Sequence, residues 1–201
     1  MGSRPQPTDL DVARWADEVV ADAAPGTVTA FVQVPVEVAD GSVDARALLT
    51  TDEGRWNDRD RPTLYVASDV AVALTEFARH LESWPGAPPP PDGTRAVIEV
   101  QLDLPSVLDL RRADVVRALG VGDPPLCFRD AALARSLARV LRERTTIAAI
   151  RTPPMAFLDA PDRWNLVVFH ENVADDGWIA VGRPVQTFRL ERPEHRDRSP
   201  G

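Results

Sequence analysis

Strand-like and helix-like segments follow one another without regular alternation, and this irregular order constrains the fold more than any other feature of the chain. A regular alternation would predict a parallel sheet covered by helices, whereas a mixed order is typical of α+β domains. The chain also lacks the G-x-G-x-x-G turn and the G-x-x-x-x-G-K-[ST] loop that hold nucleotides in Rossmann and P-loop domains. We therefore predict an α+β domain built on one or two mostly antiparallel sheets.

A strand over 63–67 leads directly into a helix over 70–81, with Ser68 and Asp69 as capping residues. Alternating or apolar runs predict further strands, and helical spacing predicts further helices. The strands cover residues 28–34, 96–102, 146–151, 165–170, 178–181 and 185–190, and the helices cover 8–26, 113–119 and 130–144. Residues 39–61 read as a long loop, and the proline-rich residues 84–93 as an exposed connection.

The 201 residues suffice for one medium-sized domain. We expect residues 1–26 to form an N-terminal helical extension and residues 27–190 to form the main domain. Residues 191–201 have almost no apolar content, so we expect a mobile tail there.

The charge balance excludes some kinds of partner. The chain has 23 basic residues, all arginine, against 31 acidic residues, which gives a net charge of -8. This balance disfavours a non-specific grip on nucleic-acid phosphates, so we expect no direct nucleic-acid partner. No apolar run approaches the roughly 18 residues needed to cross a bilayer, and the N-terminus lacks a secretory signal pattern. We therefore expect a cytoplasmic protein without a membrane partner.

Metal binding has little support in the sequence. Cys127 is the only cysteine, which excludes an intramolecular disulfide and a cysteine-cluster metal site. His80, His170 and His195 are far apart and never have the four-residue spacing that places two histidines on one helical face. We expect no bound metal.

Residues 54–76 carry the densest set of side chains with useful chemistry. Arg55 lies at the end of the long loop, Tyr65 in the following strand, and Glu76 in the second turn of the next helix. Arginine can bind a phosphate through two parallel hydrogen bonds, a phenol ring can stack on a planar heterocycle, and a carboxylate can stabilise an oxocarbenium-like sugar cation. Together these are the groups that an enzyme needs to break an N-glycosidic bond in a dinucleotide.

Each of these residues also has a purely structural interpretation. Arg55 fits a surface charge, Trp56 fits a loop anchor against the core, and Tyr65 is a good strand former. Glu76 lies off the apolar stripe of its helix and fits a solvated side chain. From the residues alone, a catalytic site and an ordinary surface both remain open.

The same segment resembles the RES domain family, which is named for an arginine, a glutamate and a serine. The resemblance rests on Gly54-Arg55-Trp56-Asn57, Leu64-Tyr65-Val66-Ala67-Ser68 and Ala73-Leu74-Thr75-Glu76. It covers about residues 27–190 and continues more weakly through residues 131–142, Thr152-Pro153 and Asn165-Leu166-Val167-Val168. Specific motifs are found only in the first half of this range.

The resemblance implies a fold like that of ADP-ribosyltransferase toxins, which is α+β with a mostly antiparallel split sheet and flanking helices. It implies degradation of NAD+ at the bond between nicotinamide and ribose, by phosphorolysis with inorganic phosphate or by hydrolysis, and no cofactor besides the substrate. Members of the family often act as toxins that are neutralised by an Xre-type antitoxin, whose C-terminal segment occupies the active site. Such an antitoxin is therefore an implied partner.

Carried over position by position, the resemblance implies three catalytic residues. Arg55 would bind the NAD+ phosphates, Tyr65 would pack on the nicotinamide side, and Glu76 would act at the nicotinamide ribose. Trp56, Asn57 and Thr152 complete the implied NAD+-binding set.

Two positions depart from the family pattern. Pro154 occupies the position of the family serine and has neither a hydroxyl nor an N–H group, so Thr152 is the nearest hydroxyl. The early strand reads Phe31-Val32-Gln33, where many relatives have an arginine. These departures bear on catalysis more than on the fold.

Two function classes follow from these observations. The intact Arg55, Tyr65 and Glu76 favour an NAD+-consuming enzyme, a toxin of a toxin-antitoxin pair. The missing serine favours a RES-like domain that has lost turnover and binds a nucleotide or a protein. A nucleic-acid-modifying ADP-ribosyltransferase is a third class, which the acidic balance disfavours. The sequence leaves the acceptor, phosphate or water, and the oligomeric state open, a homodimer included.

Overall fold

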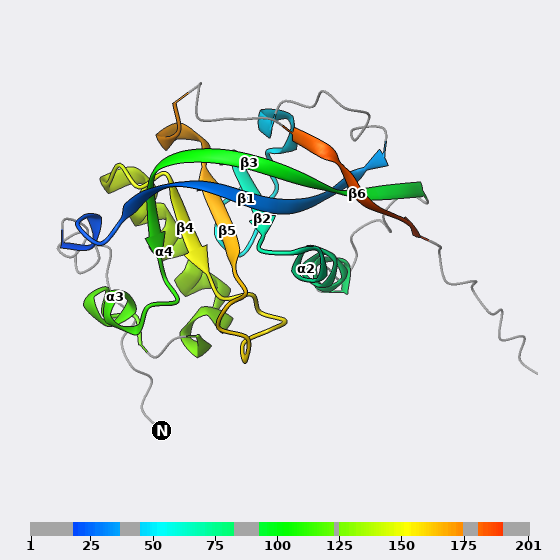
Figure 1. The fold of residues 1–201 in the computed structure, drawn as a ribbon. Coiled ribbons are helices and arrows are strands. Elements are labelled where there is room, and N and C mark those ends of the chain that lie inside the picture. Colours follow the sequence, from blue (N-terminus) through cyan, green and yellow to red (C-terminus); the bar gives the residue numbers. More distant parts are fainter. Residues whose placement is uncertain (1–17, 37–44, 83–92, 123–124, 175–180, 191–201) are drawn as a thin grey trace, which may run out of the picture.

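Six strands form one mixed sheet in the computed structural model, which describes residues 18–36, 45–82, 93–122, 125–174 and 181–190 (Figure 1). The strands are β1 (Ala24–Pro35), β2 (Thr63–Ala67), β3 (Gly93–Asp109), β4 (Ala149–Thr152), β5 (Asn165–Phe169) and β6 (Val181–Leu190). The longer helices among the described residues are α2 (Val70–Glu82), α3 (Ala113–Ala118) and α4 (Ala131–Arg144). Short 3-10 turns are η2 (Ala45–Leu48), η3 (Leu126–Arg129) and η4 (His170–Asn172).

The sheet closes on itself. Its strand order is β1-β2-β5-β4-β3-β6, and β1 also pairs with β3, so that five strands form a small barrel with β6 added along β3. The β3–β4 pairing is parallel and the other strand pairings are antiparallel. β1 pairs with β2 only at Phe31 and Ala67, and β3 pairs with β4 only through its last residues, 107–109. Two antiparallel groups, β6-β3-β1 and β2-β5-β4, are thus joined by short pairings.

The prediction of an α+β domain with a mostly antiparallel sheet is confirmed. The sheet was expected to be split into two parts. The two strand groups correspond to these parts, but hydrogen bonds join them into one sheet. The length of β3, 17 residues, explains the joining. Its first part pairs with β1 and β6, and its C-terminal end reaches β4.

Local capping signals place the helices where the sequence predicts them. The Asp69 Oδ1 atom accepts a hydrogen bond of 2.9 Å from Val72 N, and α2 begins at Val70. The Asp130 carboxylate accepts hydrogen bonds from the amides of Ala132 and Leu133 at the first turn of α4. Gly120 follows α3 with a φ of 67°, a conformation that favours glycine.

Two strands are longer than the sequence predicts, and each contains a proline. β3 extends to Asp109, beyond the predicted end at residue 102, and includes Pro105. The β1–β3 register shifts next to this position, between Ala24 and Gly26, so the missing N–H of the proline breaks no regular ladder. Similarly, residues 181–190 form one strand instead of parts of two, since Pro184 lies at an irregularity of the β3–β6 pairing.

Other predicted segments lie partly or wholly outside the described residues. Of the helix expected over 8–26, only residues 18–20 are described as helical, and β1 already begins at Ala24. Residues 84–92, 178–180 and 191–201 are not described. The described part of the long loop contains η2 and a β-bridge between Thr50 and Thr63.

Two large apolar clusters hold the sheet and the helices together. One joins alternate side chains of β1, β2, β3 and β5, among them Leu64, Ile98 and Leu166. The other packs α3 and α4 against the opposite side chains of β4 and β5, and it includes Trp56 from the loop before β2. That loop is therefore fixed by the same core that holds α4. Among the described helices, none is both long and apolar enough to span a bilayer.

Candidate functional site

The loop over residues 54–57 folds back on the hydroxyl group of Tyr65. Tyr65 Oη donates to Asn57 Oδ1 at 2.7 Å and accepts a hydrogen bond of 3.0 Å from Trp56 N. Gly54 N donates to Asn57 O at 3.0 Å. A Cβ atom on Gly54 would lie 2.5 Å from Asn57 Oδ1 and 2.7 Å from Tyr65 Oη. Only glycine therefore lets the loop approach the tyrosine this closely.

The surroundings of Tyr65 keep its phenol neutral. Burial raises the pKa of Tyr65 far above its ordinary value, and the hydrogen bond from Trp56 N opposes this only in part. A neutral phenol can donate to Asn57 while it accepts from Trp56. The structure thus places the Tyr65 hydroxyl inside the loop that carries Arg55.

Trp56 and Asn57 are buried, with exposed fractions of 4% and 2%. The Trp56 ring packs on Phe128, with 5.1 Å between the ring centroids. Asn57 Nδ2 donates to Asp52 O at 2.7 Å and to Asp58 O at 3.0 Å. Both residues, predicted from the resemblance to bind NAD+, have their side chains turned into the protein, where they hold the loop.

Arg55 reaches from this loop to the start of α4. Its Nη1 atom donates to Phe128 O at 2.8 Å and to Arg129 O at 3.1 Å. Burial lowers the pKa of the Arg55 guanidinium, the charge of Glu76 raises it, and the charge of Arg79 lowers it. Arginine nevertheless stays protonated in proteins. The effect of Glu76 shows that these two predicted residues lie within electrostatic reach of each other.

Glu76 lies on α2 and is held by the loop that follows β4. Its Oε1 atom accepts a hydrogen bond of 3.0 Å from Ala156 N. The side chain is half-buried, and Oε2 has no hydrogen-bond partner among the described residues. One carboxylate oxygen of Glu76 is therefore fixed by a backbone amide.

Thr152 and Pro154 shape the loop after β4 from its buried side. Thr152 is 1% exposed, and its Oγ1 atom lies 3.5 Å from Asn165 O, at the limit of a hydrogen bond. Pro154 is buried, and its carbonyl oxygen accepts a hydrogen bond of 3.1 Å from Phe157 N. This turn is what presents the Ala156 N–H group to Glu76.

Two arginines near the site were missed by sequence reasoning. Arg135 on α4 donates from Nη1 to Gly54 O at 3.1 Å, and Arg79 lies one helical turn after Glu76. Both lie within electrostatic reach of Arg55. In a chain where every basic residue is arginine, neither stands out by type. The spacing of Arg79 three residues after Glu76 was the one available signal.

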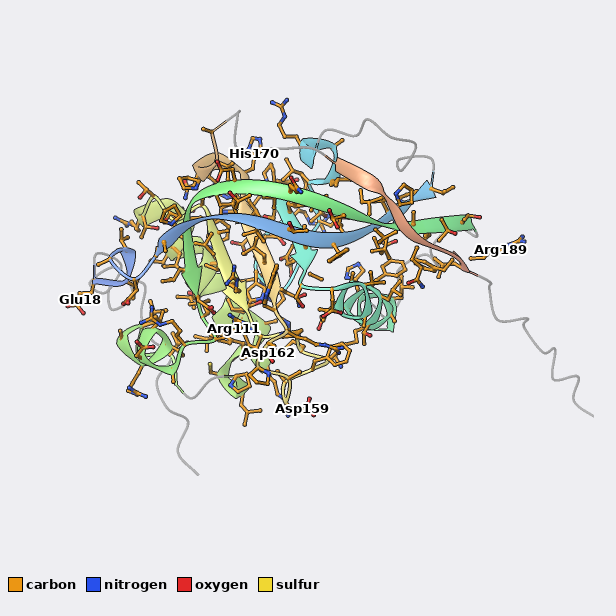
Figure 2. The ribbon with its side chains drawn as sticks, in the orientation of Figure 1. Glu18, Arg111, Asp159, Asp162, His170 and Arg189 are labelled. Carbon is orange, nitrogen blue, oxygen red and sulfur yellow. The ribbon has the colours of Figure 1, made fainter. Side chains whose placement is uncertain are left out.

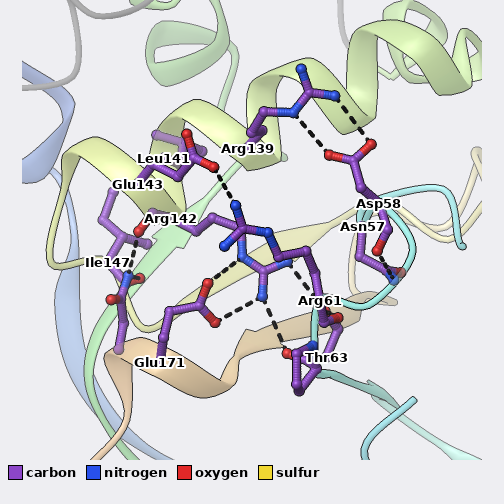
Figure 3. A network of polar contacts seen from close by, with 12 residues as sticks. Asn57, Asp58, Arg61, Thr63, Arg139, Leu141, Arg142, Glu143, Ile147 and Glu171 are labelled. Carbon is purple, nitrogen blue, oxygen red and sulfur yellow. Dashed lines mark hydrogen bonds and ion pairs between the residues drawn. The ribbon is translucent and has the colours of Figure 1, made fainter. Parts of the chain in front are cut away.

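A network of ion pairs fixes α4 relative to the site loop and to β5 (Figure 3). Arg139 Nε lies 2.8 Å from Asp58 Oδ2. Arg142, although its side chain is only 2% exposed, pairs with Glu171 at 2.7 Å and donates to Pro62 O at 3.2 Å. The C-terminal half of α4 is therefore fixed to the loop before β2 and to η4.

The loop that contacts Glu76 also forms one wall of a cavity of about 440 Å³. Arg111 lies in this cavity wall, close to Asp162 (Figure 2). Its Nε and Nη2 atoms donate to the Asp109 carboxylate and Nη1 donates to Pro161 O. The charge of Arg111 is thus compensated within the protein, which makes this cavity a weaker anion site than the region around Arg55.

The chain is similar in sequence to one protein family and in structure to a solved protein. A family model described as the RES domain matches residues 45–191. No curated protein sequence matches the chain. Among solved structures, the crystal structure of the M. tuberculosis MbcT-MbcA toxin-antitoxin complex contains a chain that is 14% identical, with a TM-score of 0.63. The match covers 90% of this chain and 92% of that chain, which shows a shared fold.

Proposed function

The chain belongs to the RES domain family, and from this premise we propose that it degrades NAD+ by cleaving the bond between nicotinamide and ribose. One observation carries the proposal. Glu76 has a carboxylate oxygen without a partner among the described residues, and it acts electrostatically on Arg55, whose guanidinium is tied to the start of α4. A carboxylate opposite a fixed cation suits a substrate with a ribose at one end and phosphates behind it.

In the proposed reaction, Arg55 binds the NAD+ phosphates and the nicotinamide ribose lies at Glu76. When the N-glycosidic bond breaks, its electron pair passes to the nicotinamide nitrogen and neutralises the pyridinium. The ribose carbon then gains oxocarbenium character, which the negative charge of Glu76 stabilises. Attack by inorganic phosphate gives ADP-ribose 1″-phosphate, and attack by water gives ADP-ribose with release of a proton.

The remaining residues of the predicted site are assigned supporting roles. Tyr65, Trp56 and Asn57 hold the loop that carries Arg55, and Thr152 holds the strand before the Glu76 loop. We propose residues 27–190 as the catalytic domain, with an ADP-ribosyltransferase-like fold. Residues 1–26 and 191–201 would flank it.

We further propose that the protein is a cytoplasmic toxin with an antitoxin partner. The support is the MbcT-MbcA complex, a toxin-antitoxin complex that contains a chain with the same fold. Expression of the chain alone is then expected to lower cellular NAD+.

Pro154 favours a second candidate function. A proline at the position of the family serine offers no hydroxyl to a ligand, and here it is buried in the turn after β4. In this alternative, the domain binds NAD+ or a related nucleotide without turnover.

Nicotinamide release by the purified protein tests the proposal. We expect NAD+ to be consumed with release of nicotinamide, and Glu76→Gln to remove most of the rate, by about a hundredfold or more, because the amide keeps the size but not the charge. Glu143→Gln is the matched control, since Glu143 lies in an exposed ion pair with Arg61. NAD+ binding without nicotinamide release, with and without phosphate, would instead support the binding module.

A further inference from the structure

Two guanidinium groups at the site loop have unused hydrogen-bond donors. Arg55 makes its hydrogen bonds through Nη1 alone, to Phe128 O and Arg129 O. Arg135 likewise uses Nη1 alone, for Gly54 O at 3.1 Å and for Glu53 at 3.5 Å. Among the residues that the structure describes, Nε and Nη2 of both side chains have no acceptor. Each guanidinium is thus anchored at one nitrogen and presents two further donors.

The charges of these two groups are poorly compensated. Carbonyl oxygens anchor both arginines, and Arg55 has no carboxylate within ion-pair distance among the described residues. Among the described residues, Glu53 is the one carboxylate within ion-pair distance of Arg135, and its side chain is 50% exposed. The Asp58 carboxylate lies within electrostatic reach of Arg135 but is itself paired with Arg139. Arg79 adds a third positive charge within reach of Arg55. Three guanidinium groups therefore gather at the site loop, in a chain that is acidic overall.

Neighbouring arginines on α4 behave differently. Arg139, one turn after Arg135, contacts both carboxylate oxygens of Asp58, and Arg142 contacts both carboxylate oxygens of Glu171. Such two-point pairing occupies the fork with which arginine grips phosphate. Of these three α4 arginines, only Arg135 has no two-point contact with a carboxylate, and it lies beside the loop that carries Arg55.

We infer that Arg135 is a second phosphate-binding residue beside Arg55, and that the pair selects a ligand with two linked phosphates over one with a single phosphate. The inference rests on the proposed function, because it assigns the diphosphate of the same ligand whose ribose lies at Glu76. A diphosphate carries two charged groups a few ångströms apart, and two anchored forks can bind both without reorganising. Arg135 is thus a specificity-determining residue that does not touch the bond that breaks.

Steady-state kinetics with NAD+ and with nicotinamide mononucleotide, which has one phosphate, test this inference. Arg135→Gln is expected to raise the KM for NAD+ by about tenfold or more, the scale of one hydrogen bond to a charged group, while kcat changes by less than about threefold. The KM for the mononucleotide should change little, so the preference for NAD+ falls. Arg135→Lys, which keeps the charge but loses the fork, should lie between wild type and Arg135→Gln.

Arg144→Gln is the matched control, since it removes an exposed arginine at the end of the same helix. Equal effects of Arg135→Gln and Arg144→Gln on the KM for NAD+ would overturn the inference. If the wild-type protein releases no nicotinamide, the proposed function fails, and calorimetric titration with ADP-ribose and with AMP decides the inference instead. Tighter binding of ADP-ribose that depends on Arg135 supports it. Binding that is equal in both variants, or no binding to the wild type, refutes it.

Discussion

The hydroxyl oxygen of Tyr65 organises the site at the scale of single residues. It contacts Asn57 Oδ1 and Trp56 N, and the Cα of Gly54 lies so close that a side chain there would collide with it. Tyr65 thus contacts or closely approaches Gly54 before Arg55 and Trp56 and Asn57 after it. The direction of the Arg55 side chain therefore depends on three neighbours that do not themselves present a charge to the ligand.

Gly54→Ala tests this dependence. We expect it to lower the free energy of unfolding by about 1–3 kcal/mol, since the added carbon would have to displace the Tyr65 and Asn57 side chains. The same change should lower nicotinamide release, because Arg55 moves with the loop. Gly26→Ala is the control, as no atom lies within 4 Å of a Cβ there. Urea unfolding monitored by circular dichroism measures both variants, and equal stabilities would show that the loop adapts to a side chain.

At the scale of elements, the residues at the start of α4 both stabilise the helix and hold the Arg55 side chain. The Asp130 carboxylate caps the helix through Ala132 N and Leu133 N. The two residues before Asp130 supply the carbonyl oxygens that anchor Arg55. A helix end that is fixed by its own cap thus also fixes the guanidinium.

Asp130→Ala is expected to cost about 1 kcal/mol of unfolding free energy, the usual contribution of a helix N-cap. It should also raise the KM for NAD+, since the carbonyl groups that hold Arg55 become less ordered. Asp130→Asn is the control, because asparagine caps helices about as well as aspartate. Thermal unfolding and the same kinetic assay measure both effects. A large loss of stability in Asp130→Asn would mean that the charge of Asp130, and not its cap, is what matters.

The elements themselves could be predicted from the sequence where their signals are local. Asp69 and Asp130 are N-cap residues that predict the start of a helix, and the apolar run from Thr63 to Ala67 predicts a strand. Arg55 and Glu76 were predicted as site residues from their chemistry and from a family resemblance. Arg135 could not be, because its importance comes from a contact with Gly54 O, far away in the sequence. The joining of the two strand groups was missed for the same reason, since strand partners are long-range contacts.

At the scale of the whole molecule, Arg142 and Glu171 connect α4 to the end of β5. The Arg142 side chain is 2% exposed and also lies over the Phe169 ring, with 4.9 Å between Cζ and the ring centroid. Burial raises the pKa of the Glu171 carboxyl, but the hydrogen bonds and charge of Arg142, a backbone hydrogen bond and the charge of Arg61 together outweigh it, so the pKa lies below its ordinary value. Glu171 is thus the partner that compensates a buried charge.

Glu171→Gln is expected to lower the free energy of unfolding at neutral pH by about 2 kcal/mol, because it leaves Arg142 buried without a counter-charge. A carboxyl whose pKa is lowered on folding contributes stability above its ordinary pKa, and this contribution is lost as the pH falls through the lowered value. Wild type should therefore lose more stability than Glu171→Gln as the pH falls from 5 to 3. Urea unfolding over this pH range measures the difference, and parallel curves would contradict the assignment. Glu143→Gln, in an exposed pair, should cost less than about 1 kcal/mol.

The pairing of β1 with β3 governs when the chain can become active during its synthesis. Thr27 and Asp103 are hydrogen-bonded partners 76 residues apart, and β2 finds its own partner only in β5. While the ribosome is still making these later strands, the early ones have no edge to join, and such long-range closures are slow. Arg55 and Glu76 are translated early, but α4 and the loop after β4, which hold them, come later. The candidate site is therefore assembled only when most of the chain has left the ribosome, which would delay the proposed activity in the cell that makes the protein.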